Sequence, residues 1–301
     1  MQSREEALKN IKLDLKREQR QLFRKRFFGN KSVVIGFILI SFMLFVAFIG
    51  PLLIQASPFT MNATERLQAP QLSHWLGTDE FGRDLLSRVV HGAQVSILVG
   101  LAVTFISAVG GLIIGLYASY YPKLDHILMR ICDGLMAIPG VLLAIALMAA
   151  LGPSPTNVVI ALSIVFTPNI ARVVRSEALV VKEQTYIEAM YAQGAKGTRI
   201  IWQHMAPNTL SPLIVQATFI FAETIITEAA LSFLGVGIPA PEPSWGNILY
   251  DGKLVIFQAW WMVVFPGLMI IISVLGLNLL GDGLRDLLDP HGSVRKRRKK
   301  K

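Results

Sequence analysis

Two glutamates interrupt an otherwise apolar stretch of the chain, residues 209–234, and they are the residues there that could do chemistry. An ionisable group inside a membrane-spanning helix is costly unless it faces a cavity or a partner. Glu223 lies near the middle of the stretch, where it either lines a solvent-filled pathway or bonds to a hydroxyl group on a neighbouring helix. Glu228 lies nearer one end, and we favour the structural role for it.

Catalytic and metal-binding motifs are missing from the sequence. The five histidines are scattered without the spacing of a zinc site, and Cys132 is the single cysteine. No G-x-x-x-x-G-K-[ST] segment occurs, so the chain carries no P-loop for ATP hydrolysis. We therefore expect no catalytic residue, no metal site and no cofactor in this chain, which would not be an enzyme.

The elements that position the two glutamates are long apolar blocks. The chain is 53% hydrophobic and 16% charged, too apolar for an ordinary soluble domain. A bilayer core requires roughly 20 apolar residues in a helix. We predict an all-α polytopic membrane protein with six transmembrane helices. The predicted spans are residues 32–54, 94–121, 134–151, 156–171, 209–234 and 256–281.

The basic residues predict the orientation of these spans. Of the 29 lysines and arginines, 25 fall in segments that six spans would place on one side. The positive-inside rule then puts both termini in the cytoplasm. Residues 1–31 are expected to form an amphipathic leader on the membrane and residues 285–301 a basic cytoplasmic tail, flanking a transmembrane domain of residues 32–284. Membrane lipid, and not nucleic acid, is the expected partner of the basic residues.

The longest inner loop, residues 172–208, carries helix signals that a mere connector would not need. Thr185 and Glu188 have the spacing of a capping box, which predicts a helix beginning at this point. The helix is expected to weaken at Gly194 and to resume until Pro207. We interpret the loop as a structured lever at the inner face of the membrane.

This loop resembles the cytoplasmic signature of the permease subunits of bacterial ABC importers. The signature matches residues 188–194, which include Ala189, and continues to a downstream Pro207. Residues 77–84 and 228–237, followed by Pro-Ser-Trp-Gly at 243–246, are similar to the second permease of dipeptide, oligopeptide and nickel importers. The likeness covers roughly residues 30–290 in matching order.

The resemblance implies a type I ABC importer permease fold in a bacterial cytoplasmic membrane. Implied partners are a homologous second permease, two ATP-binding subunits and an extracytoplasmic solute-binding protein. The implied function is passage of dipeptides or oligopeptides; nickel or a metal chelate is the alternative, and a proton-coupled carrier is less favoured. In that family the loop helix docks on an ATPase subunit. The residues expected to carry this coupling are Thr185, Glu188, Ala189, Gly194 and Pro207.

Two outer segments are candidates for the face that receives the solute-binding protein. They contribute Asp79, Arg83, Asp84 and Trp245, at what would be the mouth of the pathway. The alternative is that the charged residues pair among themselves and brace the outer loop.

Overall fold

The structure, a computed structural model, describes residues 17–18, 21 and 27–288. No β-strand occurs in these residues, and the predicted all-α fold is confirmed. Of the predicted leader and tail, residues 1–16, 19–20, 22–26 and 289–301 lie outside the described residues. The helices are α2 (Lys31–Phe48), α3 (Gly50–Leu53), η1 (Ala63–Glu65), α4 (Leu85–Tyr120), α5 (Pro122–Met136), α6 (Gly140–Leu151), α7 (Pro155–Lys182), α8 (Thr185–Ala192), α9 (Gly197–Arg199), η2 (Ile200–Met205), α10 (Ala206–Phe233), α11 (Trp245–Leu254) and α12 (Trp261–Leu288).

Five helical segments of the described chain are long and apolar enough to cross a membrane, and six if a bent pair counts as one span. The five are α2, α4, α7, α12 and the continuous segment Gly197–Phe233, which contains α10. The bent pair is α5 with α6, which meet at 92°. Pro139 precedes α6, and a proline disfavours helical backbone in the residue before it. The third span, predicted as a simple helix over residues 134–151, is therefore a broken element.

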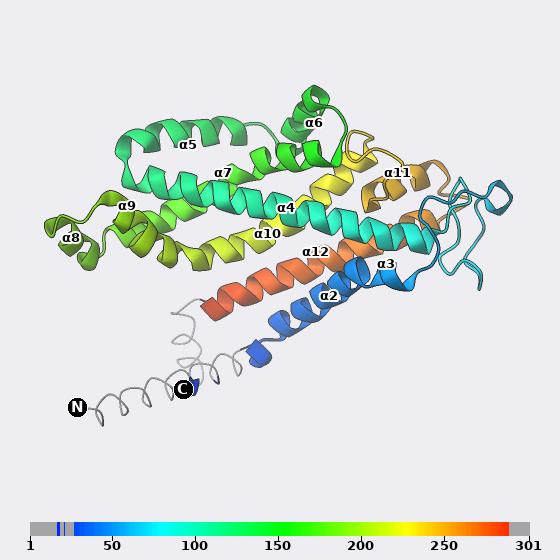
Figure 1. Cartoon of the computed structure of the whole chain (residues 1–301), viewed down its shortest axis with the longest axis horizontal. Helices are drawn as coiled ribbons and strands as arrows, with labels where there is room; N and C mark the ends of the chain where they lie inside the picture. Colours follow the sequence, from blue (N-terminus) through cyan, green and yellow to red (C-terminus); the bar gives the residue numbers. More distant parts are fainter. Residues whose placement is uncertain (1–16, 19–20, 22–26, 289–301) are drawn as a thin grey trace.

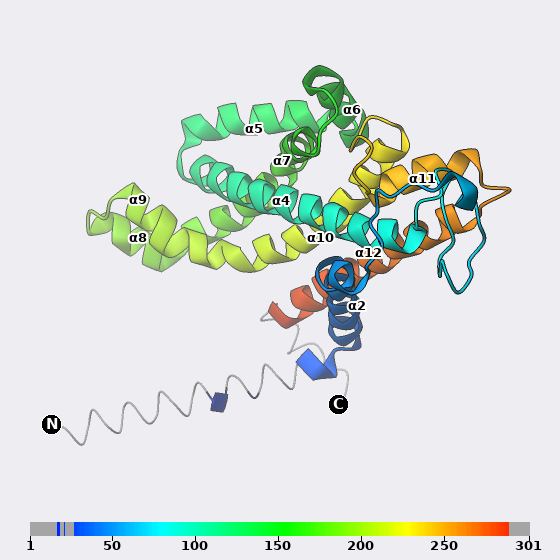
Figure 2. The same cartoon turned by 45° about the vertical axis from the view of Figure 1, so that its right-hand side comes forward.

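The helices α4, α7 and α10 pack together as the centre of the bundle (Figure 1). The pair α2 and α12 packs along α10 and α4, and α5 and α6 flank α7 on the other side. Helix α8 lies at one end of the bundle, and α11 lies at the other beside the loop that precedes α4 (Figure 2). We call these the α8 end and the α11 end.

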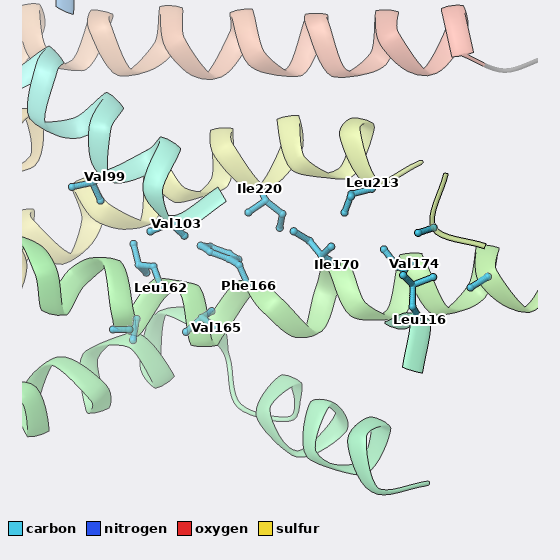
Figure 3. Close-up of a cluster of buried hydrophobic side chains, with 14 of the residues drawn as sticks. Val99, Val103, Leu116, Leu162, Val165, Phe166, Ile170, Val174, Leu213 and Ile220 are labelled. Carbon is cyan, nitrogen blue, oxygen red and sulfur yellow. The ribbon is translucent and has the colours of Figure 1, made fainter. Parts of the chain in front are cut away.

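The core between α4, α7 and α10 consists of branched aliphatic side chains around Phe166 (Figure 3). Glycines let α4 approach α7 closely, as the small-residue spacing in this helix predicts. A Cβ atom added at Gly111 would lie 2.6 Å from the Cβ atom of Ile170, and one added at Gly115 would lie 2.7 Å from the Ala171 carbonyl oxygen. The contact fixes α4 and α7 as one rigid pair.

Several helices extend beyond the spans predicted from apolarity. Helix α7 continues to Lys182, and the helix containing α10 already begins at Gly197. The segment between these helices therefore shrinks from the predicted 172–208 to little more than α8 and its turns. Helix α4 begins at Leu85 because the Asp84 carboxylate accepts a hydrogen bond from the Ser87 amide at 2.8 Å. Polar turns continue a helix beyond the apolar block, and a count of apolar residues does not register them.

Candidate coupling and translocation site

Helix α8 begins differently from the sequence prediction. Its N-cap residue is Gln184, which makes no side-chain capping bond, and Thr185 is the first helical residue. The predicted capping box of Thr185 and Glu188 is therefore wrong. Because the chain enters the helix one residue earlier than expected, the Thr185 side chain is not in the cap position, and both side chains are exposed.

One face of α8 is anchored and the other is free. Ile187 is fully buried in the main apolar cluster, and Met190 packs against the same cluster. Thr185, Glu188 and Ala189 are exposed on the remaining surface of the helix. This short helix therefore has one apolar face anchored in the bundle and one exposed face that carries Thr185 and Glu188.

Gly194 ends α8 in a tight turn. Its φ angle is +73°, which favours glycine, and its amide donates to the Tyr191 carbonyl at 3.0 Å. The next amide, of Ala195, donates to the Met190 carbonyl at 3.0 Å. A Cβ atom added at Gly194 would meet nothing within 4 Å, so the surface beside this turn is open.

Aromatic contacts tie α8 to the end of α4. The rings of Tyr191 and Tyr120 are stacked, with centroids 6.0 Å apart and planes at 20°. A Cβ atom at Gly197 would lie 2.8 Å from the Tyr120 hydroxyl oxygen. Lys182 at the end of α7 donates to the carbonyls of Ser119 at 3.0 Å and Tyr120 at 3.2 Å. Tyr120 is thus the point at which α4, α7, α8 and α9 meet.

Pro207 does not end a helix, contrary to the sequence prediction. Residues Ile200–Met205 form a π-helical segment that passes directly into α10. Pro207 is the second residue of α10, directly after the π-helical segment, and it is exposed. The adjacent Asn208 amide donates to the Tyr186 hydroxyl at 3.3 Å, which links the start of α10 to α8.

The two glutamates of α10 occupy different environments. Glu228 is fully buried, and its carboxylate accepts hydrogen bonds from Ser96 at 3.0 Å and Ser232 at 2.9 Å. The structural role favoured for Glu228 is confirmed. Glu223 is exposed in this chain, on the face of α10 that also carries Phe219 and Gln216. The sequence left its two roles open, and this position agrees with a pathway surface.

A cavity of about 570 Å³ opens between α7, α10 and α12 at the α8 end. It lies along the face of α10 on which Glu223 is found farther up the helix. Both polar and apolar side chains line it. They are Val173, Glu177, Asn208, Ser211, Pro212, Val215, Gln216, Phe219, Arg285 and Leu288.

At the α11 end a buried ionic cluster joins the loop before α4 to α11. Asp79 pairs with Arg83 at 2.5 Å and with Arg88 at 3.4 Å, and all three are at most 3% exposed. Arg83 also reaches Asp251 of α11 at 3.5 Å. Burial is the main cause that raises the pKa of Asp251, and the charge of Arg88 opposes that shift. Asp251 had no signal in the sequence, because it lies 168 positions after Arg83.

The residues expected to face a solute-binding protein are largely inside the protein. Asp79, Arg83 and Trp245 are buried, and the Trp245 ring nitrogen donates to the Val89 carbonyl at 3.1 Å. Asp84 caps α4 and contacts His74 at 2.9 Å. The prediction that these three side chains contact a docked protein directly is therefore wrong for this structure, because they are buried. The alternative reading, that the charged residues brace the outer loop, describes the observed geometry.

The chain matches known proteins over most of its length. Residues 107–293 match the family described as the binding-protein-dependent transport system inner membrane component, and residues 18–70 match the N-terminal TM domain of oligopeptide transport permease C. The dipeptide transport system permease protein DppC of Alkalihalophilus pseudofirmus is 46% identical over 87% of this chain and 86% of its own length. The di/tripeptide transport system permease protein DppC of Pseudomonas aeruginosa is 40% identical over 89% and 91%. The glutathione transport system permease protein GsiD of Pectobacterium atrosepticum is 39% identical over 89% and 90%.

Among solved structures, a chain of the inward-facing MetNI methionine ABC transporter has the same fold. It is 23% identical, with a TM-score of 0.52, and covers 68% of this chain and 98% of its own. That likeness concerns the fold alone. The family assignment rests on the length and identity of the sequence matches. The chain belongs to the family of binding-protein-dependent transport system inner membrane components, the membrane permease subunits of ABC transporters.

Proposed function

We propose that this chain forms half of the pathway through which an ATP-driven importer passes dipeptides or oligopeptides. The observation that carries the proposal is the identity of 40–46% with permeases named for dipeptide or di/tripeptide transport, over nearly their whole length. A second, homologous permease would form the other half in a bacterial cytoplasmic membrane. Two ATP-binding subunits would bind and hydrolyse the ATP, and an extracytoplasmic binding protein would deliver the solute.

The α8 end is the cytoplasmic end in this proposal. Arg172, Arg175 and Lys182 lie in the half of α7 that leads to α8, and Lys196 and Arg199 follow α8, as the positive-inside rule expects near a cytoplasmic surface. The solute-binding protein would then approach the α11 end, where the buried ionic cluster keeps the surface loops in place.

The coupling role rests on exposure and anchoring at α8. All the residues expected to couple the chain to the ATPase are exposed, namely Thr185, Glu188, Ala189, Gly194 and Pro207. Three of them lie on α8, which Ile187 anchors to the core. Gly194 lies in the turn after α8, and Pro207 lies at the start of α10. An ATP-binding subunit that contacts this helix could move α4 through the stacked rings of Tyr191 and Tyr120.

The pathway surface is the exposed face of α10. Gln216, Phe219 and Glu223 follow one another at helical spacing on that face, which begins at the cavity of the α8 end. An acidic group near the middle of a span is tolerated where water reaches it, which agrees with a pathway between two permease subunits.

Transport by the purified complex in proteoliposomes tests the proposal. We expect uptake of dialanine only when ATP, the ATP-binding subunits and the binding protein are all present. Uptake that follows an imposed proton gradient without ATP would instead identify a proton-coupled carrier. A binding protein that retains Ni²⁺ or a nickel chelate and no peptide would move the substrate class to metals.

Tyr120→Ala is expected to uncouple ATP hydrolysis from uptake. The variant removes the ring between Tyr191 and Gly197 but leaves the buried anchor of α8 in place. The complex should therefore assemble and hydrolyse ATP, while uptake per ATP falls by about tenfold, equivalent to about 1.4 kcal/mol. Tyr191→Ala should have the same effect. The two losses should not add fully in the double variant, because each single variant already removes the stacking contact between Tyr120 and Tyr191. Additive losses, or normal uptake per ATP, would contradict this route.

A further inference from the structure

The cavity at the α8 end contains two oppositely charged side chains without ion-pair partners among the described residues. Glu177 projects from α7, and Arg285 comes from the last turn of α12. Nearby acids and bases behave differently, since Arg175 pairs with Asp125 through two hydrogen bonds and Arg172 pairs with Asp133. Neither cavity residue takes part in such a pair. The charges that could have neutralised each other are held on separate walls of a cavity.

The remaining walls provide neutral groups for a polar ligand with apolar parts. Asn208, Ser211 and Gln216 offer amide and hydroxyl groups, which can donate and accept hydrogen bonds. Val215 and Phe219 add apolar surface. The volume of about 570 Å³ lies in the range of small-molecule sites.

These features select among classes of ligand. An anion would be repelled by Glu177, a cation by Arg285, and an apolar molecule would leave both charges without a partner. A molecule with a positive group at one end and a negative group at the other satisfies both walls. A short peptide with free termini has this charge pattern, and its backbone can bond to the neutral groups between them.

We propose that the cavity is a binding site for a zwitterionic peptide, with the ammonium group at Glu177 and the carboxylate at Arg285. This rests on the proposed function, because it names a place on the pathway where the transported peptide is held before release. Asn208 connects the site to the coupling helix, since its amide also donates to the Tyr186 hydroxyl of α8. A peptide that bonds to Asn208 would thereby contact the element that the ATP-binding subunits move.

Direct binding of radiolabelled dialanine to the assembled complex tests this site. The complex of both permeases and both ATP-binding subunits is used in detergent, without nucleotide and without binding protein. We expect saturable binding to the wild-type complex and none of N-acetyl-dialanine amide, which lacks both charges. Glu177→Gln and Arg285→Gln should each weaken binding at least tenfold. Asp282→Asn is the matched control, because Asp282 is an exposed acid of α12 that does not line the cavity.

Absence of saturable binding, equal binding of the uncharged analogue, or unchanged affinity in both variants would each overturn the site. Loss of the second permease from either variant on purification would identify the cavity as a subunit contact and would also overturn it. Wild-type uptake in proteoliposomes separates the two proposals. If uptake is ATP-driven while dialanine does not bind here, the site is wrong and the importer function stands.

Discussion

Asp79→Ala is expected to reduce the free energy of unfolding by about 3–5 kcal/mol, the cost of removing one partner from a buried ion pair. The carboxylate pairs with both Arg83 and Arg88, so its loss leaves two buried guanidinium groups to share the more distant Asp251. It also accepts the amide hydrogens of Phe81 and Arg83 at 2.9 Å each. Most of the variant chain should fail to accumulate in the membrane, and the rest should unfold at a clearly lower temperature in detergent.

Two further variants test whether the lost charge of Asp79 causes the destabilisation. Glu80→Ala removes the adjacent acid, which forms no ion pair among the described residues, and should leave the unfolding temperature nearly unchanged. Asp79→Asn removes the charge but retains an acceptor for the two amides, so its loss should be intermediate. If Asp79→Ala unfolds at the wild-type temperature, the cluster does not brace the α11 end, and contact with a binding protein must be reconsidered for these residues.

Gly194→Trp is expected to abolish uptake, with a loss well beyond tenfold, and to release the ATP-binding subunits on purification. A Cβ atom added at Gly194 meets nothing within 4 Å, so the bulky ring would project outward from this chain. It would occupy the surface that the ATP-binding subunit must cover. The φ angle of +73° adds strain of about 1–3 kcal/mol, which the folded helical bundle should survive. Membrane insertion should therefore be retained while partner binding is lost.

Gly152→Trp is the matched control for Gly194→Trp. Gly152 has a φ angle of +84°, and a Cβ atom there likewise meets nothing within 4 Å. It lies between α6 and α7, at the opposite end of α7 from α8. The control should suffer the same strain but keep the ATP-binding subunits. Equal retention of these subunits in both variants, with normal uptake, would show that the α8 turn is only a connector.

The spans were predictable because apolar blocks long enough to cross a bilayer leave an unambiguous record in the sequence. The ends of the helices were not predictable, as α4 and α7 show. A polar turn such as Asp84 to Ser87 extends a helix without adding apolar residues. The break between α5 and α6 also escaped prediction, although Pro139 marks its place. A proline before an apolar run is compatible with both a new helix and a kink, and packing decides between them.

The site was predictable only where a local pattern carried it. Residues 188–194 mark the segment that we propose for coupling, yet the capping box expected at its start does not form because Gln184 takes the cap position. Asp79 and Arg83 lie four residues apart and suggested a local brace, whereas Asp251, the second acidic partner of Arg83, comes from α11. Glu177 and Arg285 line separate walls of one cavity through the packing of three helices, which no spacing in the chain records.

Photo-crosslinking from α8 tests most directly whether this chain transmits work from an ATPase. A benzoylphenylalanine residue is placed at Glu188 in the intact complex, and a second one at Thr64, which is exposed in η1 beyond the α11 end. We expect illumination to attach the ATP-binding subunits to position 188 and not to position 64. Attachment from position 64 alone, or from neither position in a complex that imports peptide, would contradict α8 as the coupling element.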